Sequence, residues 1–241
     1  MQDKPKFFGR RKGRTIRKAK SFLLDNFLPL IRIEPQPATD VASCFAEQKE
    51  KYCLEIGFGD GEHLAALSQD FPQYGFIGVE VYKNGVANLL TLITGVKDGT
   101  EDDLSQEIKL LPQRTDNVRI YDDDVRLLFD SFPDAVFDKV YLLFPDPWPK
   151  TKHANRRFIN PDNLKTLARI IKKDGILQVA TDSHIYKVWT LETMHANPDF
   201  EWTAKCSDDW RNPPADWHET KYQRKAIREG RRPVFFEFRR K

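Results

Sequence analysis

Short apolar segments alternate with helix-like segments along most of the chain. The apolar segments are residues 51–56, 75–80, 117–121, 138–144 and 175–181. The segments with a helical pattern are residues 62–69, 83–94, 125–129, 160–173 and 185–195. Apolar strands that alternate with helices and are buried on both faces are typical of α/β proteins. The pattern therefore predicts a doubly wound, mostly parallel sheet with its ligand at the carboxyl ends of the strands.

The two ends of the chain differ from this central region. Residues 200–204 and 233–239 are β-like and predict an antiparallel pair that closes the sheet, with a polar, basic stretch at 220–232 between them. Residues 1–20 lack apolar periodicity and are expected to form a flexible basic arm. Two prolines at 34–40 indicate a linker. We therefore expect an arm at 1–20, a helix and linker at 21–49, and the main domain at 50–241.

The composition and the charge distribution limit the classes of protein to which the chain can belong. A chain of 241 residues with 40% hydrophobic and 31% charged residues falls in the globular range. Its net charge is +3, yet residues 1–20 and 221–241 each hold nine basic residues against one and two acidic ones. Basic ends around an acidic body indicate a polyanionic partner, although solvated charged termini are an alternative.

The cysteine content and the hydropathy of the chain indicate where in the cell the protein is expected. Three cysteines without paired spacing predict neither a disulfide framework nor a four-cysteine zinc site, and they suit a cytoplasmic protein. No secretory signal is recognisable, and the best apolar segment, Phe22–Ile31, is too short to span a membrane. We expect no membrane association.

A glycine-rich turn follows the first apolar segment, in LEIGFGDGEHL. Gly57, Gly59 and Gly61 let the backbone turn tightly and approach a ligand. The spacing is one residue shorter than the dinucleotide fingerprint. Glu55 and Asp60 place carboxylates beside the turn, which would repel a pyrophosphate and attract a cation. These features favour S-adenosylmethionine, which carries a sulfonium and an ammonium, over a nicotinamide cofactor.

Acidic residues lie at the ends of the next two apolar segments. Glu80 comes 23 residues after Gly57, where a carboxylate can accept hydrogen bonds from both ribose hydroxyls. Asp122, Asp123 and Asp124 follow the third segment, where one of them can bind the adenine amino group. An acid in such a position is often only a helix cap, so the prediction rests on the whole series.

The fourth apolar segment leads into LLFPDPWPKTKHANRRFI. Three prolines restrict the backbone around Asp146 and Trp148, so that the aromatic ring can stack on a base while the acid binds its hydrogen-bonding edge. Asp182, after the fifth segment, is a second candidate for the substrate. A basic cluster follows Trp148 and is suited to phosphates: Lys150, Lys152, His153, Arg156 and Arg157. His153 has no second ligand at metal spacing, so we expect no metal.

These segments resemble the bacterial tRNA (guanine-N(7)-)-methyltransferase family. The resemblance also extends to FIGVEVYKNGV, ATDSHIY and TKYQRKAIREGRRPVFFEF. It implies a class I methyltransferase-like fold, S-adenosyl-L-methionine as cofactor and tRNA as partner. It implies cofactor contacts at Glu55, Glu80, Asp123 and Asp146. It implies substrate contacts at Lys150, Asp182, Thr220, Lys221, Tyr222 and Gln223.

The chain departs from this family in two places. Gln223 stands where the family usually has an acid. The stretch between residues 95 and 116, with a polar segment at 97–107, is longer than usual and is expected to be an exposed insertion.

The chemistry of the guanine ring limits what catalysis requires. Guanine N7 has an in-plane lone pair and no proton, so it can attack the sulfonium methyl group without a general base. Orientation is then the main contribution. We expect Asp146, and also Asp182, to stabilise the positive charge that develops on the ring.

Two alternatives remain at this level. Asp146-Pro147-Trp148 resembles the motif of amino-nitrogen methyltransferases, and a non-catalytic RNA-binding module would also be basic. The sequence is compatible with a monomer or a homodimer.

Overall fold

The computed structural model describes residues 7–36, 40–96 and 116–241. The chain divides into two compact units, Met1–Phe132 and Pro133–Lys241. The strand order is β3-β2-β1-β4-β5-β7-β6. The predicted α/β class, with a mostly parallel sheet and an antiparallel C-terminal strand, is confirmed.

Unit 1 contains three parallel strands, β1 (Lys51–Ile56), β2 (Tyr74–Val79) and β3 (Val118–Tyr121). After their first residues, β1 and β2 are buried throughout, as expected of strands covered on both faces. The α-helices of unit 1 are α1 (Lys18–Asn26), α2 (Leu28–Ile31), α3 (Glu62–Asp70) and α4 (Lys83–Thr94). Its 3-10 helices include η1 (Ala42–Cys44), η3 (Val125–Leu127) and η4 (Phe129–Ser131).

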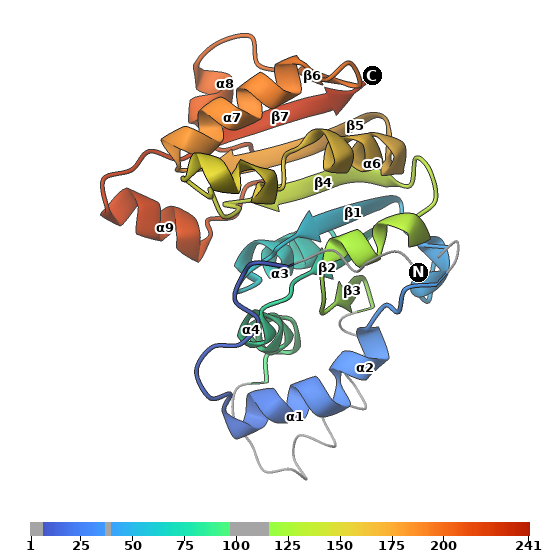
Figure 1. Ribbon diagram of the computed structural model, residues 1–241. Helices are drawn as coiled ribbons and strands as arrows, with labels where there is room; N and C mark the ends of the chain where they lie inside the picture. The colour runs from blue at the N-terminus through green and yellow to red at the C-terminus, as the bar shows by residue number, and fades with distance from the viewer. Residues whose placement is uncertain (1–6, 37–39, 97–115) are drawn as a thin grey trace. The chain divides into compact units, whose positions relative to one another are not determined.

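Helix packing in unit 1 follows the apolar faces of its helices. Helix α3 packs on β2 and on α4, and α1 lies alongside α4 (Figure 1). Helix α4 also approaches the glycine-rich turn closely: a Cβ atom on Gly85 would lie 2.1 Å from the carbonyl oxygen of Gly59. The absence of a side chain at Gly85 therefore lets the helix contact the turn backbone.

Unit 2 contains β4 (Phe137–Leu143), β5 (Ile171–Thr181), β6 (Phe200–Trp202) and β7 (Val234–Arg240). Strands β4 and β5 are parallel, whereas β7 is antiparallel to both β5 and β6, which confirms the predicted antiparallel closure. The helices are η5 (Thr151–Arg156), α6 (Pro161–Ile170), α7 (His184–His195), α8 (Asp208–Arg211) and α9 (Lys221–Arg228). Helix α6 packs against β5, α7 against β6 and α8 against β7 (Figure 1).

The largest differences from the predicted elements lie at β5 and α9. The helix expected over 160–173 begins as predicted, with Asn160 capping it and Pro161 in its first turn, but ends at Ile170. Strand β5 starts at once, because Ile171 pairs with Phe137 before the register shifts near Asp174, whose φ is +63°. Residues 125–129 form 3-10 turns instead of an α-helix.

Helix α9 is amphipathic: its uncharged residues share one side of the helix, and two of them, Gln223 and Ala226, are buried. The side chain of Thr220 caps it by accepting a hydrogen bond from the Gln223 backbone N–H, which satisfies one of the free donors of the first turn. From the sequence, residues 220–232 were described only as a polar, basic stretch, so this helix was not predicted. The predicted insertion at 97–107 lies outside the described residues.

The contact of α4 with the glycine-rich turn can be tested with Gly85→Ala. The added methyl group must displace backbone, and overpacking of this kind typically costs about 1–3 kcal/mol. Alanine has a higher helix propensity than glycine, which offsets at most about 1 kcal/mol of this cost. We therefore expect the free energy of unfolding, measured by chemical denaturation, to fall by roughly 1–2 kcal/mol. Lys83→Ala, at an exposed position of the same helix, is the control. A Gly85→Ala protein as stable as this control would contradict the packing.

Candidate functional site

The glycine-rich turn after β1 adopts the conformation that its glycines predict. Gly57, Gly59 and Gly61 have φ values of +70°, +59° and +78°, which residues with a Cβ atom rarely adopt. A Cβ atom on Gly57 would have no neighbour within 4 Å. The turn therefore leaves open space beside Gly57, as a bound nucleoside requires.

The carboxylate of Glu80 joins this turn to the start of α4. Its Oε2 accepts a hydrogen bond from the Gly59 N–H at 2.7 Å, and its Oε1 accepts one from the Tyr82 N–H at 2.8 Å. Glu80 is buried, so these charge-assisted bonds offset the cost of burying the carboxylate. The expectation that Glu80 contacts the ribose hydroxyls stays a prediction.

Glu55 lies deeper in unit 1 than the sequence suggests. It is 2% exposed, and its Oε2 lies 2.9 Å from Nδ1 of His63 on α3, which is 1% exposed. This buried pair links β1 to the helix that follows the glycine-rich turn. Removal of one partner would leave a buried charge or polar group without this interaction. Its contact with a cofactor stays a prediction.

Each of the three aspartates after β3 interacts with a different arginine. Asp122 pairs with Arg32, Asp123 with Arg11 and Asp124 with Arg126. The Asp124 side chain also accepts a hydrogen bond from the Arg126 N–H, and so caps η3. The side chain of Asp123 is 36% exposed, against 7% for Asp124. Asp123 is therefore more accessible to a ligand than Asp124.

Part of the predicted N-terminal arm contacts α4. The Arg11 carbonyl accepts from the Lys83 N–H, and the Asn84 side chain exchanges hydrogen bonds with the backbone of Gly13 and Arg14. The guanidinium of Arg11 lies 2.8 Å from Oδ1 of Asp123. In unit 1 the arm thus reaches one of the predicted cofactor residues.

In unit 2, the loop after β4 holds an unusual backbone conformation. Phe144 and Trp148 have φ values of +52° and +42°, which cost energy for residues other than glycine. The buried Arg157 donates hydrogen bonds to the carbonyls of Pro147 and Trp148, at 3.1 Å each. It also lies over the Trp189 ring. Arg157 was expected to bind phosphate, but its side chain supports the Asp146 loop.

Trp148 lies among residues of the basic cluster, and its predicted stacking on a base stays a prediction. The Arg156 guanidinium lies over its ring, 5.0 Å from the centroid, and His153 meets it edge-on. Desolvation, with smaller contributions from Arg156 and Lys150, lowers the pKa of His153. These effects favour the neutral form of the His153 imidazole. Lys150 and Lys152 are exposed.

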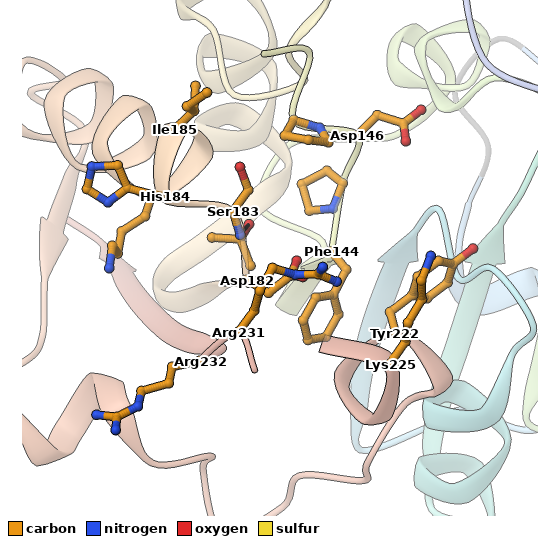
Figure 2. A pocket seen from close by; sticks show the side chains of 14 residues that line it. Phe144, Asp146, Asp182, Ser183, His184, Ile185, Tyr222, Lys225, Arg231 and Arg232 are labelled. Atoms are coloured by element: carbon orange, nitrogen blue, oxygen red, sulfur yellow. Dashed lines mark hydrogen bonds and ion pairs between the residues drawn. The ribbon is translucent and has the colours of Figure 1, made fainter. Parts of the chain in front are cut away.

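A cavity of about 710 Å³ lies at the carboxyl ends of β4 and β5 in unit 2, a size typical of ligand sites. It brings together three predicted residues, Asp146, Asp182 and Tyr222 of α9. Figure 2 shows the Asp146 side chain directed away from Asp182. The other predicted substrate residues, Lys150, Thr220, Lys221 and Gln223, do not line this cavity.

The cavity contains residues that the sequence did not single out. Phe144 is stacked on Tyr222, with 6.5 Å between ring centroids and planes 21° apart. The cationic side chains that line it are Lys187, Lys225, Arg231 and Arg232. Tyr222 was predicted from the family resemblance, but the stacked aromatic pair depends on the docking of α9. Only the basic character of 220–232 gave a signal for Arg231 and Arg232.

Gln223 is anchored within unit 2. It is 8% exposed, and its Oε1 accepts a hydrogen bond from Nε1 of Trp217 at 2.6 Å. The Trp217 ring packs edge-on against Phe235 of β7, with 4.7 Å between centroids. An amide oxygen thus supplies the acceptor, and no carboxylate is required for this contact. Direct contacts of Thr220 and Gln223 with a substrate stay predictions.

In the described part of the chain, no group of three His, Cys, Asp or Glu residues is placed to hold a metal ion. Within the same ranges, no helix is long and apolar enough to cross a membrane.

Comparisons with known proteins identify the family of the chain. A family described as putative methyltransferase matches residues 49–235. The chain is 41% identical over 99% of its length to a tRNA (guanine-N(7)-)-methyltransferase of Paramagnetospirillum magneticum, of which it covers 94%. It is 43% identical over 97% of its length to the protein of that description from Rhizobium meliloti, again covering 94%.

A solved structure agrees at the level of the fold. The 16S rRNA methyltransferase KamB matches with a TM-score of 0.50, over 86% of this chain and 95% of that one, at 14% identity. This likeness supports the methyltransferase fold alone.

The Gln223–Trp217 contact predicts how substitutions at position 223 behave. Gln223→Leu removes the acceptor of the Trp217 N–H and should lower the free energy of unfolding by about 1–2 kcal/mol. Gln223→Glu keeps an acceptor and should remain within about 0.5–1 kcal/mol of wild type. Chemical denaturation followed by tryptophan fluorescence measures both.

Trp217→Phe provides the control, because it removes the indole N–H. In the Trp217→Phe background, Gln223→Leu should lower the free energy of unfolding by clearly less than in the wild-type protein. An equal cost in both backgrounds would mean that the hydrogen bond is not the source of the stability.

Proposed function

The chain belongs to the tRNA (guanine-N(7)-)-methyltransferase family, and we propose on this basis that it transfers a methyl group from S-adenosyl-L-methionine to N7 of a guanine in tRNA. The observation that carries the proposal is identity of 41% over 99% of the chain to a relative of that name. The polar residues that follow the strands in each unit are chemically suited to this reaction.

The cofactor side of the reaction is assigned mainly to unit 1. S-adenosylmethionine supplies an electrophilic methyl group when bound. We propose that the backbone of Gly57 and Gly59 lies against it, because the space beside Gly57 is open. The carboxylates proposed to contact it are Glu55, Glu80, Asp123 and Asp146. Glu80, already fixed by two backbone N–H groups, would accept from the ribose hydroxyls without further ordering.

The base side of the reaction is assigned to the cavity in unit 2. Guanine N7 needs no general base, so the chain has only to orient the ring and stabilise its new positive charge. Asp146 and Asp182 line the cavity and can accept hydrogen bonds from the N–H groups of the base. Asp146 is the proposed catalytic residue. The stacked pair Phe144 and Tyr222 offers the ring an aromatic surface.

Contacts with the RNA backbone are assigned to exposed basic residues. Lys150 and Lys152 flank the start of η5, and Lys221 lies at the start of α9. Neutralised phosphates release counterions, so such contacts weaken as salt rises. Thr220, Tyr222 and Gln223 complete the proposed substrate segment. We further propose a cytoplasmic location, where tRNA is modified, and a monomeric or homodimeric state that light scattering would distinguish.

The function is tested by incubating the protein with methyl-labelled S-adenosylmethionine and unmodified tRNA, then identifying the labelled nucleoside by mass spectrometry. We expect 7-methylguanosine. Methylated adenosine or cytidine would indicate an amino-nitrogen methyltransferase instead. Absence of any label, with tRNA binding retained, would indicate an RNA-binding module without activity.

The role of Asp146 is tested by Asp146→Asn. The substitution removes the negative charge that stabilises the methylated ring, and loss of one such preorganised group typically lowers kcat by about 100-fold to 1000-fold. Single-turnover methylation at saturating cofactor and tRNA measures this effect. Asp162→Asn, at an exposed position in the first turn of α6, is the control. Wild-type turnover in Asp146→Asn would contradict the assignment.

A further inference from the structure

An ion pair lies inside the cavity of unit 2. Nε of Arg231 donates to Oδ2 of Asp182 at 2.6 Å, and both residues line the cavity. Nη1 of Arg231 donates to Glu229. In the described part of the chain Nη2 has no partner. Figure 2 shows Arg231 beside Asp182.

Local structure explains why Arg231 reaches this position. Helix α9 ends in a Schellman motif: Gly230 has a φ of +74°, and the Arg231 N–H bonds to the carbonyl of Ala226. Strand β7 then begins at Val234, which pairs with Thr181, the last residue of β5. The helix end and the strand start therefore hold residue 231 next to the residue that follows Thr181, which is Asp182.

The pair presents a defined hydrogen-bonding pattern. A guanidinium only donates and an ionised carboxylate only accepts, so the cavity offers a donor next to acceptors. The Watson–Crick edge of guanine has the complementary order, with the O6 acceptor followed by the N1–H and N2–H donors. Adenine has a donor where guanine has O6, and an acceptor where guanine has N1–H.

We propose that Arg231 is a specificity-determining residue that donates to guanine O6 while Asp182 accepts from N1–H and N2–H. This inference rests on the proposed function, since it takes the bound base to be guanine. The contact leaves N7 unobstructed, because O6 and the N1–H and N2–H groups lie on the Watson–Crick edge and N7 does not.

The charges around Arg231 are compatible with this role. Arg231 interacts with two carboxylates, those of Asp182 and Glu229, so the three groups together carry one negative charge. A ring that becomes positive during methylation therefore still meets a net negative environment. The side chains are 42% and 22% exposed for Arg231 and Asp182, and a pair this accessible to water rearranges readily when a base enters.

The experiment combines enzyme variants with altered bases. Once wild-type enzyme has located the methylated guanosine, tRNAs carrying guanosine, inosine or 2-aminopurine riboside there are compared by kcat/KM. Inosine keeps O6 and lacks the 2-amino group, whereas 2-aminopurine lacks O6. Arg231→Met keeps the apolar stem and removes the donors. Arg232→Met removes the same charge from a neighbour that lines the same cavity.

We expect Arg231→Met to lower kcat/KM about tenfold on guanosine and inosine, and to change it little on 2-aminopurine. Arg232→Met should lower all three values by a similar factor, as loss of a phosphate contact would. Arg231→Lys, which restores one donor, should recover part of the activity on guanosine and inosine only. Calorimetric binding of S-adenosylmethionine checks that each variant is folded.

A similar loss on all three tRNAs in Arg231→Met, or no loss on guanosine, would overturn the proposal. So would recovery by Arg231→Lys on 2-aminopurine to the same degree as on guanosine. If wild-type enzyme forms no 7-methylguanosine, the proposed function itself fails, and this appears in the wild-type arm before any variant is compared.

Discussion

Because parallel strands are buried on both faces, the polar groups that can contact a ligand lie mainly at the ends of the strands. In β1 and β2 every residue after the first is buried, so a polar side chain within them must be satisfied inside the protein. The positions just beyond the strands are different. Gly57 follows β1, Glu80 follows β2 and Asp182 follows β5. Apart from Glu55, which lies within β1, the carboxylates proposed to contact a ligand therefore lie beyond the carboxyl ends of the strands in each unit.

This constraint also explains which features the sequence could predict. An apolar run in the sequence predicts a buried strand. The first polar residue after that run therefore lies at the end of the strand. Glu80 and Asp182 were identified in this way. The boundary of β5 could not be identified, because Ile170 and Ile171 continue the amphipathic pattern of α6 while the chain has already begun to pair with β4.

Sequence patterns could not predict which side chains interact with one another. Glu55 looked like an acid beside a ligand, and its pairing with His63 appears only when α3 packs on the sheet. Arg157 belonged to a basic cluster, yet its guanidinium turns inward to two carbonyls. A charged residue gives the same signal in the sequence whether it faces water or supports a loop, so only the tertiary contacts separate these roles.

Gln223 illustrates how a substitution within a family can change the response to acid. A carboxylate at this position would lose its charge, and part of its strength as an acceptor, as the pH fell through its pKa. The amide oxygen that accepts from Trp217 does not titrate. In this chain the hydrogen bond between Trp217 and α9 therefore keeps its strength as the pH falls.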